Sequence, residues 1–234
     1  VASVGDYVKV GDPLFQLAAS DKYVRTMAPI EDRTTRFDRR SAPIEMNRKL
    51  RIGYVSSDLR HHAVGYLMVN FFEEHDHADF EVFAYYTGIK AEDPIQARIK
   101  ASCDHWRDIR NITDDEAAAL IAEDGIDILV DVKGATHGTL MPVTAHRAAP
   151  LQVSWLGFPG TTGAAYVDYF IGDPITTPLA HAAHFSEKLA QMPLCYQPND
   201  AKRALPAPSK RSDWGAPEGV PLLCAFHQSY KISE

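Results

Sequence analysis

The chain has 234 residues, 45% of them hydrophobic, a size and composition typical of an ordinary globular protein with one substantial core. The formal net charge of −7 is spread along the sequence, and the Lys and Arg residues form no basic stripe that could neutralise a run of phosphates. Nucleic acid is therefore not an expected partner. The three cysteines are far apart and form neither a disulfide framework nor a metal-binding pair, which favours a cytoplasmic location.

No apolar run approaches the roughly 20 residues that a bilayer span requires, and the first residues lack the features of a signal peptide. We therefore expect no membrane partner. The sequence opens at Val1 rather than Met and stops at Glu234, one turn after an apolar segment. We expect the protein to continue beyond both ends.

Two parts of the chain differ in composition. Residues 1–49 contain glycines, a proline and a stretch of alternating charge, and they predict a linker. From Leu50 onward, short apolar runs alternate with helical spacing. The expected strands are 50–55, 81–86, 126–132, 151–156, 167–171, 188–192 and 221–226. The expected helices are 65–75, 93–102, 114–123 and 140–146, with Thr113 as the N-cap of the third.

This order of strands and helices predicts an α/β fold, namely a Rossmann-like doubly wound parallel sheet covered by helices on both faces. Such sheets bind ligands where loops leave the carboxyl ends of the strands. The Pro- and Lys-rich residues 198–221 predict an excursion over the surface.

The loop after the first strand carries a carboxylate and two imidazoles, Asp58, His61 and His62. Histidine is the side chain best matched to proton transfer near neutral pH, so His62 is the first candidate for a reacting group. The alternative is structural, with Asp58 capping the turn and both histidines in solvent.

Two more loops at expected strand ends are rich in glycine. Residues 155–163 read WLGFPGTTG, in which glycines allow backbone amides to approach a ligand closely, although a tight turn would use the same residues. Residues 133–138 read KGATHG and add a cationic and a protonatable group. The remaining histidines show no HExxH pattern and no metal-ligand spacing, and they are expected at the surface or at helix ends.

Five sequence motifs follow one another in an order that is similar to that of a known family. LRIGYVSSDLRHHAVGYLM is followed by DGIDILVDVKGATHG, RAAPLQVSWLGFPGTTGAAYVDYFIGDP, FSEKLAQMP and CAFHQSYKI. Together they resemble the protein O-GlcNAc transferase and SPINDLY family from about Leu50 to Glu234. The resemblance implies the first Rossmann-like lobe of a GT-B-type glycosyltransferase. It also implies an upstream tetratricopeptide-repeat region before residues 1–49, a first catalytic lobe at 50–220 and the start of a nucleotide-sugar-binding second lobe at 221–234.

The resemblance also implies site residues. Asp58 and His62 would lie beside the donor sugar, and His62 would act as a base or as a positioning group. Leu156, Gly157 and Pro159 would form the loop against the transferred sugar, and Thr136 and His137 stand where animal enzymes have Thr-Lys. Gln228 and Lys231 match a Gln-x-x-Lys that contacts the nucleotide, with Lys231 facing the diphosphate.

The implied reaction is inverting transfer of N-acetylglucosamine from UDP-GlcNAc to Ser or Thr hydroxyls of proteins recruited by upstream repeats. No cofactor and no metal are expected, because Lys231, helix termini and backbone amides can neutralise the diphosphate. Ala63 and Val64 replace a Pro-Thr of the animal enzymes, so the donor identity stays open. The alternatives are SPINDLY-type transfer of fucose from GDP-fucose and a non-catalytic scaffold. The isolated chain is expected to be inactive, because it would supply only half of the cleft.

Overall fold

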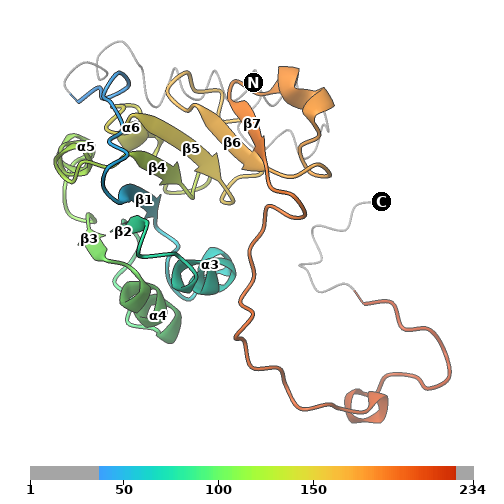
Figure 1. The fold of residues 1–234 in the computed structure, drawn as a ribbon. Coiled ribbons are helices and arrows are strands. Elements are labelled where there is room, and N and C mark those ends of the chain that lie inside the picture. The colour runs from blue at the N-terminus through green and yellow to red at the C-terminus, as the bar shows by residue number, and fades with distance from the viewer. Residues whose placement is uncertain (1–36, 225–234) are drawn as a thin grey trace. The chain divides into compact units, whose positions relative to one another are not determined.

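A computed structural model describes residues 37–224 of the chain. Contacts divide the chain into two compact units, Val1–Ala201 and Lys202–Glu234. The described part of the first unit is built on one seven-stranded parallel sheet with the order β3-β2-β1-β4-β5-β6-β7 (Figure 1). The predicted α/β fold with a parallel sheet is therefore confirmed.

Six of the seven strands fall on predicted segments. They are β1 (Leu50–Ser56), β2 (Phe80–Tyr86), β4 (Ile128–Asp131), β5 (Leu151–Trp155), β6 (Tyr169–Gly172) and β7 (Lys188–Gln191). The seventh, β3 (His105–Asp108), was not predicted. It is a four-residue edge strand whose side chains are half-buried or exposed, so its sequence HWRD lacks the apolar pattern of the central strands.

The four predicted helices are α3 (Ala63–Glu73), α4 (Pro94–Ser102), α5 (Asp114–Glu123) and α6 (Met141–Thr144). Thr113 caps α5 as predicted, since its hydroxyl accepts from the Glu116 amide while the Glu116 carboxylate accepts from the Thr113 amide. Two short 3-10 helices, η2 (Leu179–His184) and η3 (Arg211–Trp214), were not predicted. None of the helices described within residues 37–224 has the length and apolar character of a membrane span.

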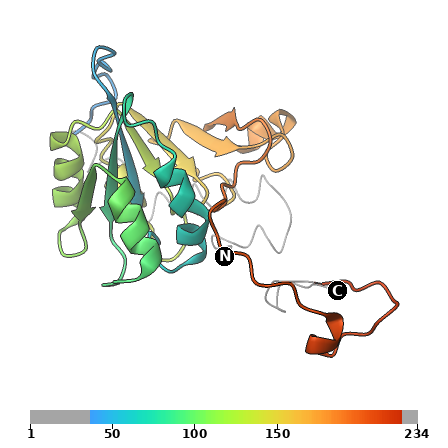
Figure 2. The same cartoon turned by 60° about the horizontal axis from the view of Figure 1, so that its bottom comes forward.

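Both faces of the sheet are covered, because successive strand residues point to opposite sides. Tyr54 belongs to a core cluster with residues of α3 and α4, whereas the next residue, Val55, belongs to a second cluster with residues of α5 and α6. Figures 1 and 2 show α3 and α4 together on one side of the sheet and α5 on the other. This two-sided burial explains the continuous apolar runs of the central strands.

The second unit is described as far as residue 224. It holds η3, and Arg211 donates to the carbonyls of Pro217 and Val220. Residues 201–210 are all exposed, as expected for a surface excursion. Residues 221–224 form no strand, and the remainder of the strand predicted at 221–226 lies outside the described residues. The predicted domain boundaries at residues 50 and 221 stay predictions.

Candidate functional site

Three loops leave the carboxyl ends of neighbouring strands. We call them the β1 loop (57–62), the β4 loop (132–140) and the β5 loop (156–163). Because β1, β4 and β5 are adjacent and parallel, these loops lie at one edge of the sheet. The structure thus brings together the three segments that the sequence singled out.

The β1 loop and the β4 loop are joined by a buried ion pair. The Lys133 ammonium lies 2.6 Å from Oδ2 of Asp58, and both side chains are only 8% exposed. The second carboxylate oxygen of Asp58 accepts from the Ser57 hydroxyl at 3.0 Å, and the Asp58 amide donates to Ser56 Oγ. Asp58 therefore faces the protein interior rather than solvent.

The turn that presents Lys133 is held by a second carboxylate. Asp131, the last residue of β4, accepts from the backbone amides of Lys133 at 2.8 Å and Gly134 at 3.1 Å. Burial raises the pKa of Asp131 to about 6, although these amides and the Lys133 charge act in the opposite direction. Asp131 thereby fixes the backbone conformation of Lys133 and Gly134.

His62 is the N-cap of α3. Its backbone is extended, and its ring Nδ1 accepts from the Val64 amide at 3.2 Å. The same Nδ1 lies 3.9 Å from Oδ2 of Asp58, and 39% of the side chain is exposed. Burial lowers the pKa of His62, and the charges of Arg60 and Lys133 lower it further, whereas Asp58 raises it.

The other histidine of the loop fits the structural alternative. His61 is exposed, its amide donates to Asp93 at 2.9 Å, and its ring meets Tyr66 edge to face. The pair of adjacent histidines thus divides into a capping residue and a solvated one. The Asp58 carboxylate does not cap the turn as that alternative expects, because its partners among the described residues are the Ser57 hydroxyl and the Lys133 ammonium rather than a backbone amide.

The β5 loop packs tightly on the β4 loop. Gly157 has no room for a side chain, since a Cβ there would collide with the carbonyl of Val132 and come within 2.6 Å of Cα of Lys133. The residue before it, Leu156, is buried and adopts a left-handed backbone with φ of 70°. Such a conformation costs a residue with a side chain free energy and needs strong support from its surroundings.

The far end of the β5 loop is held by Glu187, the residue before β7. Its buried carboxylate accepts from the Thr161 hydroxyl at 2.7 Å, from the Thr162 amide at 2.7 Å and from the Thr162 hydroxyl. The two threonines of the TTG sequence are therefore engaged in holding the loop. Both threonines are at most 2% exposed.

The two predicted site residues of the β4 loop have different environments. Thr136 donates its hydroxyl to the carbonyl of Lys133 at 2.9 Å, so it closes the turn. His137 is exposed. Pro159 lies in the β5 loop, whereas Gln228 and Lys231 lie outside the described residues.

Sequence reasoning did not assign a role to Lys133 or Glu187. Lys133 was visible as a cation in a glycine-rich loop, but its partner is 75 residues away in the sequence. Glu187 is separated by 25 residues from Thr162, and no spacing rule joins them. A carboxylate directly before an expected strand was the only available signal.

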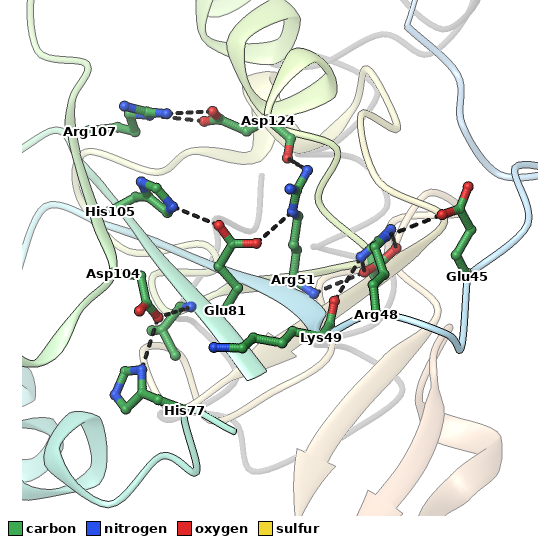
Figure 3. Close-up of polar contacts among 12 residues, drawn as sticks. Glu45, Arg48, Lys49, Arg51, His77, Glu81, Asp104, His105, Arg107 and Asp124 are labelled. Carbon is green, nitrogen blue, oxygen red and sulfur yellow. Dashed lines mark hydrogen bonds and ion pairs between the residues drawn. The ribbon is translucent and has the colours of Figure 1, made fainter. Parts of the chain in front are cut away.

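The amino ends of the strands hold a different group of charges (Figure 3). Arg51 and His105 share the carboxylate of Glu81 at 2.8 Å each, and Arg107 pairs with Asp124 at 2.6 Å. His105 lies in the edge strand β3 with a side chain that is 35% exposed. His146 is buried just after α6, so the expected surface position is wrong for His146. Within residues 37–224, no three His, Cys, Asp or Glu side chains gather as a metal site.

A doubly wound parallel sheet with a histidine loop, a lysine turn and a glycine loop at its carboxyl edge defines an α/β lobe, a class of fold whose ligand sites are found at that edge. The sequence model of glycosyl transferase family 41 matches residues 27–212. The chain therefore belongs to glycosyl transferase family 41, which confirms the resemblance found in its motifs.

Similar proteins agree with this membership. A probable UDP-N-acetylglucosamine–peptide N-acetylglucosaminyltransferase SEC of Arabidopsis thaliana is 39% identical over 79% of this chain and 20% of its own length. The corresponding enzyme of Caenorhabditis elegans is 40% identical over 64% of this chain and 13% of its own length. A mutant O-GlcNAc transferase of Thermobaculum terrenum superposes with a TM-score of 0.73 at 33% identity, over 84% of this chain and 38% of that chain. The chain thus spans about a fifth or less of the length of the Arabidopsis and Caenorhabditis relatives.

Proposed function

We propose that this chain supplies the first lobe of an inverting glycosyltransferase that moves N-acetylglucosamine from UDP-GlcNAc to Ser or Thr hydroxyls of proteins. The observation that carries the proposal is that the β1 loop, which bears His62, contacts the β4 loop, and that the β4 loop contacts the β5 loop, in a member of family 41. Relatives named as peptide N-acetylglucosaminyltransferases support the choice of donor. Cytoplasmic location and acceptor recruitment by upstream repeats belong to the same proposal.

The described residues would act on the sugar side of the reaction. His62 is a half-exposed polar group at the edge, and Leu156, Gly157 and Pro159 belong to the loop that would pack against the transferred sugar. Thr136 and His137 would flank it. Asp58 is buried beneath His62 and bound to Lys133, so we propose that it positions the imidazole rather than touches the sugar.

The leaving diphosphate would be met by Lys231, with Gln228 on the nucleotide. A cation at that place stabilises charge that grows as the glycosidic bond breaks, so it acts on turnover more than on ground-state binding. No metal is needed in this scheme. In a polypeptide that includes residues 1–234 and the whole catalytic region of the family, Lys231→Met should lower turnover by about 10²–10³-fold.

Donor choice tests the proposal directly. The same longer polypeptide should transfer sugar from UDP-GlcNAc to a Ser/Thr peptide, with inversion at the anomeric carbon, and EDTA should not abolish the transfer. A preference for GDP-fucose would replace the donor with that of SPINDLY-type transfer. Absence of transfer together with absence of UDP binding in calorimetry would identify a non-catalytic scaffold and overturn the proposal.

A further inference from the structure

The buried pair of Asp58 and Lys133 lies directly under the imidazole of His62. The same carboxylate oxygen, Oδ2 of Asp58, lies near both groups: it is 2.6 Å from the lysine ammonium and 3.9 Å from Nδ1 of the histidine. The charged groups that act on the ring are Asp58 and Arg60 from its own loop and Lys133 from the β4 loop. Two of these three are cations.

The helix cap fixes which ring nitrogen carries a proton. A neutral imidazole has one N–H donor and one acceptor nitrogen. The Val64 amide donates to Nδ1, so Nδ1 is the acceptor and the proton resides on Nε2. A carboxylate as close as Asp58 favours the opposite arrangement, in which Nδ1 carries a proton and donates to the carboxylate.

Lys133 decides between these two arrangements. Its ammonium occupies the oxygen of Asp58 nearest the ring and neutralises the carboxylate charge. Asp131 keeps the lysine in place by holding its backbone amide. We propose that Lys133 is a positioning residue which, by binding Asp58, keeps His62 neutral with its proton on Nε2 and thereby makes it a hydrogen-bond donor at the site.

The consequence for catalysis rests on the function proposed above. An Nε2–H group can donate to an oxygen of a sugar, a hydroxyl or a phosphate, but it cannot accept the proton of an attacking hydroxyl. His62 would therefore orient a ligand, and the acceptor proton would leave through another group. Without Lys133, the Asp58–His62 pair would resemble the dyads that hold a histidine as a base.

The ring nitrogens can be observed directly in the 234-residue chain by ¹⁵N NMR, without any assay of sugar transfer. The His62 signals are identified by their absence in His62→Asn. In the unmodified chain we expect a neutral ring with the proton on Nε2 at pH 7.5. A proton found on Nδ1 would overturn the proposal, whether or not the longer protein transfers sugar.

Variants then test the role of the lysine. In Lys133→Met, the midpoint of the His62 titration should rise by about one pH unit and the Nδ1–H form should appear. Lys133→Gln should also raise the midpoint. Its amide can still donate to Asp58, but it lacks the positive charge that neutralises the carboxylate. The double variant Asp58→Asn/Lys133→Met should return the ring to its original state.

His77 provides the internal control. It pairs with Asp104 at 2.9 Å at the amino edge of the sheet, and its ring ¹⁵N signals should be the same in every variant. An unchanged His62 midpoint in folded Lys133→Gln, or a double variant that keeps the raised midpoint, would overturn the proposal.

Discussion

The two edges of the sheet hold their charges in different ways. At the amino edge, Arg51, Glu81 and His105 form a chain of ion pairs in which every side chain is 25–35% exposed. At the carboxyl edge, Asp58 and Lys133 form a single pair with 8% exposure on each side. An exposed pair contributes little net free energy, whereas breaking a buried pair leaves an uncompensated charge. The number of ion pairs at an edge therefore does not indicate where substitutions are costly.

The largest expected effect is at the buried pair. Lys133→Met should lower the free energy of unfolding by about 3–5 kcal/mol, because the Asp58 carboxylate stays buried without its cation. Urea denaturation of the 234-residue chain measures this loss. The double variant Asp58→Asn/Lys133→Met should recover most of it, and a double variant as unstable as the single one would contradict the explanation.

The next effect concerns the anchor of the β5 loop. Glu187→Ala removes the acceptor of the Thr161 hydroxyl and of both the amide and the hydroxyl of Thr162, and should cost about 2–4 kcal/mol. Glu187→Gln retains one side-chain oxygen and should lose less. Equal losses in the two variants would show that the carboxylate hydrogen bonds are not what holds the loop.

A smaller loss is expected where the two glycine-rich loops touch. Gly157→Ala should destabilise the chain by about 1–3 kcal/mol, because the new methyl group meets the backbone of Val132 and Lys133 rather than a movable side chain. Amide chemical shifts of the β4 and β5 loops should change together. Unchanged stability would mean that the loops separate freely, which would weaken the comparison between the edges.

The smallest effect is expected at the amino edge. Burial raises the pKa of Glu81, but hydrogen bonds from His105 and Arg51 outweigh it and hold the pKa below its ordinary value of 4.5. Glu81 therefore contributes stability above pH 4.5 and loses that contribution as the pH falls through its lowered pKa. Glu81→Gln should cost at most about 1 kcal/mol at pH 7, after solvent screening, and nothing in strong acid. A loss at pH 7 as large as that of Lys133→Met would break the comparison.

Sequence patterns predicted most of the fold because the central strands are apolar on both faces and the helices bury one face against the sheet. The edge strand β3 escaped prediction, since it pairs with β2 alone and its residues His105 and Arg107 belong to the charge network rather than to an apolar core. Strand ends shifted by one or two residues. Asp127, for example, was expected within a strand but lies just before β4, and its carboxylate pairs with Arg48 and accepts from the amide of Arg51.

The position of the site could be predicted from the sequence, but most of its side-chain contacts could not. Parallel topology is sufficient to bring the β1, β4 and β5 loops together, and this needs no knowledge of side-chain directions. The contacts of Lys133 with Asp58 and of Glu187 with Thr162 depend on rotamers and loop paths, which periodicity does not contain. The capping role of His62 was also missed, because histidine is not among the preferred N-cap residues.

The capping of α3 by His62 has a practical consequence for any mutational study of this region. Alanine at residue 62 would remove an imidazole from the site and also leave the Val64 amide without its acceptor, so a defect could not be attributed to one loss or the other. Asparagine is among the best N-cap residues and can supply the missing acceptor. His62→Asn is therefore the substitution that separates the chemistry of this side chain from the integrity of the helix it begins.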